Sequence, residues 1–415
     1  MNSKNIPIFI SIIVLLQLVV LFIIQPEINL WEDHNMAVSL LQTGDAFCYN
    51  DGQPNHSFVF PVYYGVVFFV YKIFGIVPIY VAALHLIFNG ATAFFAYKAA
   101  VFFIETNSLI DKIFFARDKI ASVLACSVLF HPFIFWYSFA NVHPFAFDMF
   151  FFYACLFFTT VYFRNKTMLN LLIFAVVYGL AVLDRPTLMV CVIPFLLLSF
   201  KYMETNKIIL NFSVISILSI MIIAPYLIRN YHTDKIFGFN SNTGKILWKG
   251  VLYNSEGSNY LKNGKNYYAA LGSKDFGLLI NLSVKDQNKF FMNKYIEIWK
   301  EDPFQVIKMY LVKLKNFWWF RENIGNEYSQ AIQTFIPLYK IMYGGMLLFA
   351  VFFCMFSSKG IFFLVSAPIA LSLFQSFFYV ETRHRIIIEP ILIFLAILGL
   401  FLLRHKLSIL KNNYN

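Results

Sequence analysis

The stretch IPIFISIIVLLQLVVLFII, residues 6–24, decides the fold class. It carries no charged residue, and a helix needs about 20 mainly apolar residues to cross the hydrocarbon core of a bilayer. Similar runs follow along the chain, which is 59% hydrophobic, 20% aromatic and only 13% charged. Because backbone groups inside lipid need internal hydrogen bonds, these runs predict an all-α integral membrane protein.

About ten of these runs are long enough to be expected as transmembrane helices. They cover residues 6–24, 76–97, 120–140, 145–163, 168–183, 186–200, 208–228, 335–356, 361–379 and 386–403. The first run is followed by QPEINLWEDH rather than by a small-residue cleavage site, so we interpret it as a retained helix and not as a signal peptide.

Lys and Arg concentrate in the short connections between alternate apolar runs. These connections are KAAVFFIETNSLIDKIFFARDK, RNK, KYMETNK and SSKG, and the C-terminal tail RHKLSILKNNYN has the same character. Such a bias marks the cytoplasmic side of a membrane protein, so both termini are expected in the cytoplasm. The formal net charge of +11 is therefore better explained by membrane orientation than by nucleic-acid binding.

The same orientation places five elements together on the extracytoplasmic side. They are the loop at 25–75, the turns around Asn141–His143 and Asp184, a loop of roughly a hundred residues from Arg229, and ETRHR at 381–385. We expect an N-terminal bundle at 1–228, an extracytoplasmic loop at 229–334, and C-terminal helices with a short tail at 335–415.

Two further apolar stretches are expected to lie along the outer interface. FVFPVYYGVVFFVYKIFG, residues 58–75, contains Pro61 and several tyrosines, which favour an interfacial helix. The alternative, a true span, would invert every later loop. Residues 290–320 show apolar positions at helical spacing with lysines opposite, which predicts a second helix lying flat on the same face.

The first external loop contains the most suggestive polar motif, WEDHNMAVSLLQTG at 31–44. Glu32 and Asp33 could simply stabilise the positive end of a short helix that Gly44 terminates. However, carboxylates near a membrane are costly to desolvate, which makes them candidates for a functional role. The motif therefore keeps two interpretations, a helix start and a catalytic acid pair.

Arginines gather on the same expected side, each beside an apolar run. They are Arg185 in DRPT, Arg229 in APYLIRNYH, and Arg383 and Arg385 in ETRHR. A guanidinium binds phosphate oxygens with bidentate geometry, so a lipid-linked phosphate is a plausible ligand, although any one of these arginines could be only an interfacial anchor. Carboxylates opposite arginines suggest group transfer from such a phosphate to a hydroxyl or amine.

Four stretches in this order resemble the GT-C superfamily of polytopic glycosyltransferases, in particular the branch related to dolichyl-phosphate-mannose protein mannosyltransferases and lipid A aminoarabinose transferases. The first loop at 32–75 is similar in its acid, Gly and Pro-Tyr pattern, which includes Tyr63. LAVLDRPTLMVCVIPFLLL is similar in its Arg-Pro turn. Residues 222–250 share a Pro-aromatic, Arg-Asn and Leu-Trp-x-Gly order that includes Trp248, and RHRIIIEPILIFLAILG resembles the last external turn.

The resemblance implies inverting sugar transfer from a polyprenyl-phosphate-linked donor, with the first-loop acid as general base. Asp33 is the expected base, with Glu32 as the alternative, and Arg185, Arg229, Arg383 and Arg385 are expected to bind the donor phosphate. His34 and His143 depart from the family pattern, because relatives carry an aromatic residue and an acid there. Together with Tyr63 and Trp248 they are accessory candidates.

The expected partners are membrane lipids, the lipid-linked donor, and a glycolipid, polysaccharide or protein acceptor, at the outer face of a bacterial cytoplasmic membrane. No metal ligand set is predicted, and a divalent cofactor is left open. A transporter or lipid flippase is the main alternative, since it would also have many spans and buried charges. A non-catalytic scaffold is another.

Overall fold

The computed structural model describes residues 5–107, 117–321, 330–357 and 361–414, and it is almost entirely helical. Six helices of the described chain are long and apolar enough to cross a membrane. They are α1 (Ile6–Ile24), α4 (Pro78–Thr106), α8 (Phe145–Arg164), α11 (Thr205–Asp234), α16 (Gln330–Phe356) and α19 (Glu389–Tyr414). The predicted multi-pass membrane architecture is therefore supported.

A bent pair of helices occupies the expected span at 120–140. α6 (Arg117–Leu129) and α7 (Pro132–Ala140) meet at an angle of 42° and would give a seventh span if they cross as one unit. Pro132 lacks an N–H and so breaks the helical hydrogen bonding at the bend. The side-chain amide of Gln17 compensates in part, because it donates to the carbonyl oxygen of Leu129 at 3.0 Å.

The remaining three expected spans are shorter apolar helices. Residues 168–183 form α9 (Met168–Asp184), residues 186–200 form η2 (Pro186–Cys191) and α10 (Val192–Tyr202), and residues 361–379 form α17 (Ile361–Gln375). At 1.5 Å rise per residue, helices of 17 residues or fewer fall short of the roughly 30 Å hydrocarbon core. Length and composition thus support six or seven spans in the described chain.

The polar connections form short elements between the long helices. The first loop contains α2 (Glu32–Thr43), the antiparallel strands β2 (Cys48–Asn50) and β3 (Gln53–Asn55), and α3 (Pro61–Phe74). β1 (Asn29–Leu30) pairs in parallel with β4 (Asn141–Val142), which joins this loop to the turn before α8. α3 has only 14 residues and does not qualify as a span by length.

The long loop contains α12 (Thr243–Lys249), η3 (Tyr267–Ala270), α13 (Ser273–Leu279), α14 (Val284–Glu301) and α15 (Pro303–Trp318), and α18 (Arg383–Ile386) precedes α19. The helix expected over 290–320 is divided into α14 and α15. The division falls at Asp302, whose side chain accepts from the Gln305 N–H and so begins the second helix just before Pro303.

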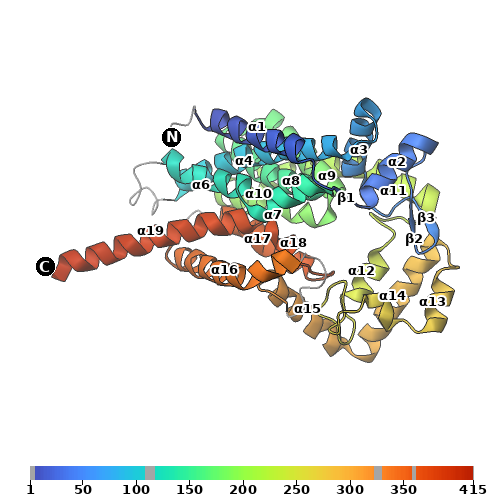
Figure 1. The fold of residues 1–415 in the computed structure, drawn as a ribbon. Coiled ribbons are helices and arrows are strands. Elements are labelled where there is room, and N and C mark those ends of the chain that lie inside the picture. The colour runs from blue at the N-terminus through green and yellow to red at the C-terminus, as the bar shows by residue number, and fades with distance from the viewer. Residues whose placement is uncertain (1–4, 108–116, 322–329, 358–360, 415) are drawn as a thin grey trace.

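The apolar helices pack as two groups around a shared, aromatic-rich core. α4 packs against α6 and α8, α9 packs against α8 and α11, and α16 packs against α19. Figure 1 shows α2, β2, β3, α12, α13 and α14 together at one end of the molecule, while the start of α1 and the end of α19 lie at the opposite end. The polar elements of distant chain segments therefore meet at one end of the bundle.

Candidate active site

A cavity of about 580 Å³ lies where these polar elements meet. Its lining comes from the loop between α1 and α4, the turn before α8, the end of α9, the long loop and the segment before α18. The ionisable side chains among the lining residues are Glu32, Asp33, Asp51, Asp184, Glu381, Lys245, Lys249, Arg383, His143 and the tyrosines 63, 260, 267, 268 and 379. Most of the segments expected together on one side thus contribute to one cavity.

Asp33 lies in the first turn of α2 and is only 4% exposed. No side chain of the described residues hydrogen-bonds to its carboxylate. Burial, followed by the charges of Glu32 and Asp148, holds the pKa of Asp33 well above its usual range. The helix-start interpretation accounts for the position of Asp33 but not for its burial against the cavity. A carboxylate with this environment is a stronger proton acceptor than an exposed one.

Asp184 is a second buried carboxylate at the cavity, and the sequence interpretation did not select it. It is the last residue of α9 and is 2% exposed, and neither carboxylate oxygen has a hydrogen-bond partner in the part of the chain that the structure describes. The sequence does contain a signal for Asp184, because this acid directly precedes the Arg-Pro turn in DRPT. Orphaned buried carboxylate oxygens are rare because they lose hydration without compensation, so Asp184 is a strong ligand-binding candidate.

Tyr63, on α3, lines the same cavity. The hydroxyl lies 2.8 Å from Nε2 of His85, and Nδ1 of His85 lies 3.3 Å from the carbonyl oxygen of Ser138. A carbonyl only accepts, so in neutral His85 the proton is on Nδ1 and Nε2 accepts the Tyr63 proton. Because its proton is donated to His85, the Tyr63 oxygen can only accept a hydrogen bond from a ligand. We name Asp33, Asp184 and Tyr63 the acid corner.

Cations from two segments line another part of the cavity: Lys245, Lys249 and Arg383, which we name the cation wall. Lys245 pairs with Asp51 at 2.6 Å, and Arg383 pairs with Glu381 at 2.8 Å. Lys249 instead donates to the side-chain oxygen of Asn259 at 2.6 Å and has no carboxylate at ion-pair distance among the described residues. The sequence interpretation missed Lys245 and Lys249, because the sequence of a long loop does not show which of its lysines will lie at a cavity.

Lys249 is the cation best prepared for an anionic ligand. Its ammonium lies 3.5 Å from the ring centroid of Tyr379, and the side chain as a whole is buried. Burial lowers the pKa of Lys249 to about 7, although the nearby Glu381 opposes this shift. An anion bound beside Lys249 would favour its charged form.

The other predicted arginines do not line the cavity. Arg185 pairs with Asp148 at 2.5 Å, close behind the acid corner. Arg385 is fully buried, pairs with Glu389 at 2.9 Å, and lies 4.1 Å from the ring centroids of both Phe320 and Tyr343. These contacts join helices rather than face the cavity.

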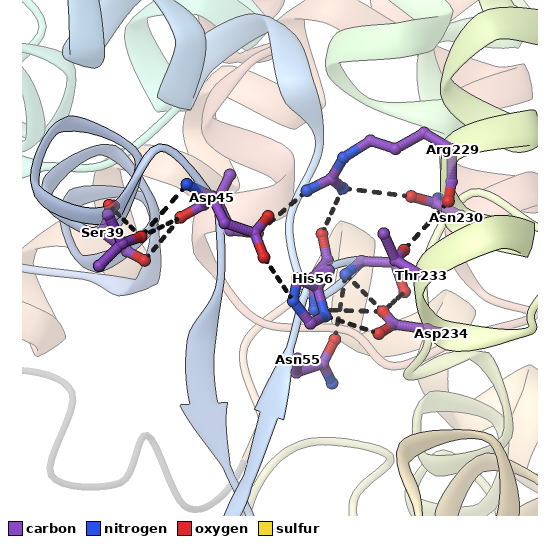
Figure 2. Close-up of polar contacts among 11 residues, drawn as sticks. Ser39, Asp45, Asn55, His56, Arg229, Asn230, Thr233 and Asp234 are labelled. Carbon is purple, nitrogen blue, oxygen red and sulfur yellow. Dashed lines mark hydrogen bonds and ion pairs between the residues drawn. The ribbon is translucent and has the colours of Figure 1, made fainter.

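Arg229 is bound to the backbone of the first loop. Its guanidinium donates to the carbonyl oxygens of His56 and Ala46 at 2.7 and 3.0 Å (Figure 2). His56 in turn lies between Asp45 and Asp234, with nitrogen–oxygen distances of 3.0 and 2.9 Å. We name His56, Asp45 and Asp234 the loop clasp, because it attaches the first loop to the end of α11 just before the lining residues 58–60.

The accessory candidates take different positions. His143 lines the cavity, and its Nδ1 accepts from the Phe145 N–H at the start of α8. Burial and the charges of Arg383 and Arg185 hold the pKa of His143 well below its usual range, so it is a neutral side chain. His34 instead contacts the Tyr71 hydroxyl at 2.7 Å, and Trp248 packs against Phe291 in a separate small core.

Comparisons with known proteins do not identify a family for this chain. The chain matches no protein-family model and no curated protein sequence. Its function must therefore be inferred from the cavity itself.

Proposed function

We propose that this protein is a membrane glycosyltransferase of the GT-C type that transfers a sugar from a polyprenyl-phosphate-linked donor to an extracytoplasmic acceptor with inversion. In this proposal the ten apolar segments, including the three short ones, all contribute to the membrane domain. The cavity opens on the outer face of a bacterial cytoplasmic membrane, and the acceptor is a glycolipid, a polysaccharide or a protein.

One observation carries the proposal: a single cavity joins a buried carboxylate without a side-chain partner, Asp33, to a wall containing Lys249 and Arg383. Displacement at a sugar carbon bound to phosphate requires a base on the acceptor and positive charge on the departing phosphate. A cavity of about 580 Å³ is in the size range of small-molecule sites and can hold a sugar with its phosphate.

The proposed step balances as a direct displacement. The acceptor hydroxyl gives its proton to the Asp33 carboxylate while its oxygen forms a bond to the anomeric carbon. The bond between that carbon and the phosphate oxygen breaks, and its electron pair leaves with the polyprenyl phosphate. Lys249 and Arg383 stabilise the charge that develops on the phosphate.

This arrangement narrows the residue roles suggested by the sequence. Asp33 is the proposed base, with Glu32 as a neighbouring acid that raises its proton affinity. Arg383 keeps its proposed phosphate role, and Lys249 replaces Arg385 and Arg229 in it. Arg185 is proposed to act indirectly, since it pairs with Asp148, whose charge raises the pKa of Asp33. His143 is proposed to shape the cavity as a neutral group.

The test compares glycan and glycolipid profiles of cells that express wild type, Asp33→Asn, Glu32→Gln or Lys249→Met at equal membrane levels. Asp33→Asn is expected to remove a glycoform completely, because amide nitrogen cannot accept the proton. Lys249→Met should reduce the same glycoform by tenfold or more through weaker phosphate binding. Asp275→Asn is the control, because it breaks only a surface ion pair with Lys294. Unchanged profiles in both Asp33→Asn and Lys249→Met would contradict the proposal and favour transport.

A further inference from the structure

The part of the cavity that the long loop forms differs in chemistry from the acid corner. Five asparagines line the cavity, and four of them belong to the long loop. We name this set the amide wall: Asn50, Asn240, Asn242, Asn259 and Asn266. Three tyrosines that follow Asn259 and Asn266 in sequence, Tyr260, Tyr267 and Tyr268, also line the cavity. Much of the lining therefore consists of polar groups that carry no charge at neutral pH.

Three members of the amide wall keep hydrogen-bonding groups that the protein does not use. Asn50 and Asn259 hold charged side chains of the cavity through both ends of their amides. Asn240 and Asn266 accept backbone N–H groups through Oδ1, while Nδ2 of each has no partner among the described residues. Asn242 is only 8% exposed, and its side chain makes no hydrogen bond within the described chain. An amide so enclosed needs a partner, which points to a polar ligand.

The unused amide of Asn242 lies apart from the proposed phosphate site. Asn242 directly precedes α12, and Lys249 is the last residue of α12. At a rise of about 1.5 Å per residue, the two positions are about 10 Å apart along the helix. Between them, Lys245 is paired with Asp51 and so adds no net charge. A phosphate at Lys249 therefore leaves the Asn242 end of the cavity for a second, neutral group.

The amide wall belongs to the part of the molecule that lies away from the ends of the long apolar helices. Figure 1 shows α12 with α13 and α14 at the end opposite the start of α1 and the end of α19, and α12 packs against α14. The polyprenyl tail of the proposed donor needs the apolar environment of the bilayer and its helices. The amide wall is therefore better placed to receive a water-soluble group than a lipid tail.

We propose that the amide wall binds a saccharide acceptor, so that the transferred sugar is added to a hydroxyl group of another sugar. The inference rests on the proposed glycosyl transfer and specifies its acceptor. A sugar hydroxyl both donates and accepts hydrogen bonds, a side-chain amide does the same, and neither group is charged. The tyrosine rings provide apolar faces for the C–H groups of a sugar ring.

The transfer step keeps the balance already given. The hydroxyl oxygen of the acceptor sugar forms the glycosidic bond to the anomeric carbon of the donor, and its proton passes to the Asp33 carboxylate. The bond from that carbon to the phosphate oxygen breaks, and the polyprenyl phosphate leaves with the electron pair. The amide wall takes no part in proton transfer, and its role is to hold the acceptor sugar.

A peptide or an anionic headgroup fits the amide wall less well. Peptides are typically bound along an open strand edge or in an apolar groove. Asn242 instead lies at the start of a helix, and Asn266 is paired with Tyr260 in an isolated β-bridge. An anionic headgroup would need a cation at this end of α12, where Lys245 already holds Asp51.

The experiment determines what the transferred sugar is attached to. The glycoform that is present in cells with wild type and absent with Asp33→Asn is isolated and assigned to the protein, lipid-extractable or lipid-free polysaccharide fraction. Methylation linkage analysis then identifies the atom that carries the added sugar. We expect a glycosidic bond to a sugar hydroxyl. The fraction shows whether that saccharide is the headgroup of a glycolipid or part of a free polysaccharide.

Variants assign acceptor binding to the amide wall. Asn242→Leu keeps the size of the side chain and removes its hydrogen bonds, so it should lower the amount of the glycoform about tenfold. Binding of farnesyl phosphate to the purified full-length protein in detergent micelles should be unchanged in Asn242→Leu but weaker in Lys249→Met. The control is Asn293→Leu, at an exposed asparagine of α14 outside the cavity.

A second variant guards against misfolding of Asn242→Leu. Asn266→Asp keeps the side-chain oxygen that accepts from the Tyr268 N–H and removes the unused Nδ2 donor, so it should also lower the amount of the glycoform. Thermal melting of each purified variant identifies any loss of folding. If Asn242→Leu does not fold, the comparison rests on Asn266→Asp.

The outcomes separate the two proposals. Attachment of the sugar to a protein side chain or to a lipid phosphate overturns the saccharide inference and leaves glycosyl transfer standing. Full glycoform levels in the folded amide-wall variants also overturn it, and so does loss of farnesyl phosphate binding in Asn242→Leu, which would assign the wall to the donor. Absence of any glycoform that depends on Asp33 contradicts the proposed function instead.

Discussion

At the scale of single residues, burial of Asp33 in the cavity suits the proposed proton transfer but lowers the stability of the folded protein at neutral pH. Asp33 is buried where its pKa is raised, so the folded protein holds the Asp33 proton more tightly than the unfolded chain does. Stability from this group is therefore greatest below the unfolded pKa of about 4 and is lost as pH rises toward the raised pKa. A group retained despite this cost at neutral pH is a functional candidate.

Asp33→Asn should accordingly make the protein more stable at pH 7.5, because the substitution removes a buried ionisable group of similar shape. The gain is about 1.4 kcal/mol for each unit by which the pKa is raised, less any hydrogen bond that the amide fails to make. Thermal unfolding of both proteins between pH 4 and 8 measures it. The difference should shrink toward pH 4, where both side chains are neutral, and a destabilised variant at pH 7.5 would contradict the argument.

Arg385 shows what the sequence could not distinguish at this scale. Arg383 and Arg385 lie two residues apart in one motif, yet one lines the cavity and the other is enclosed by Phe320, Tyr343 and Glu389. The aromatic partners come from distant segments, so only the tertiary structure separates the two arginines. The acid at 33 was predictable because its motif is local, whereas Lys249 and Asp184 required the assembled cavity.

Arg385→Gln should therefore act on stability rather than on phosphate affinity. Removing the guanidinium breaks the buried pair with Glu389, which keeps only its contacts with His131 and Tyr339, and breaking such a pair typically costs about 3–5 kcal/mol. The melting temperature should fall markedly, while Lys340→Gln, a neighbouring change on α16, should have little effect. If Arg385→Gln keeps its stability but loses binding of the phosphate esters, the role suggested by sequence is correct instead.

At the scale of elements, the loop clasp joins the first loop, between α1 and α4, to α11. The hydrogen bond with Asp234, together with the charges of Asp234 and Asp45, raises the pKa of His56, although burial opposes the shift. A raised pKa means that the folded state favours charged His56. The clasp contributes stability below the unfolded pKa of about 6.5 and loses it as pH rises through the higher folded value. Sequence alone gave no sign of the contact with α11, because His56 and Asp234 are 178 residues apart.

His56→Gln should lower the melting temperature at pH 6 and have a smaller effect at pH 8.5. Trypsin or chymotrypsin cleavage within residues 45–60 should also become faster in the variant at the lower pH, because the loop is released from α11. His232→Gln, at an exposed histidine two residues before Asp234, is the control. An effect of His56→Gln that does not change with pH would mean that the ion pairs contribute nothing beyond packing.

At the scale of the whole molecule, the apolar runs predicted the helices well but not their lengths. All ten expected segments contain helices, yet the break before Pro132 and the short α9, η2–α10 and α17 reduce the clear spans to six or seven. Hydropathy reports apolar character, which is the same for a span and for a short helix buried among others. Pro132 was the available sequence signal for the break inside the span expected at 120–140.

The positions of the chain ends make the topology testable. The cavity elements lie at one end of the molecule, and the start of α1 and the end of α19 lie at the other (Figure 1). The basic tail, with Arg404, Lys406 and Lys411, is expected in the cytoplasm, so the cavity should face outward. In a chain whose own cysteines are replaced by serine, an impermeant maleimide should label Asn263→Cys in intact cells. Lys411→Cys should react only after permeabilisation, because its helix ends on the far side. Labelling of both positions in intact cells would mean that an even number of spans separates them and would contradict the cytoplasmic tail. Labelling of Asn263→Cys only after permeabilisation would place the cavity on the cytoplasmic side, away from the face on which a lipid-linked sugar is proposed to arrive.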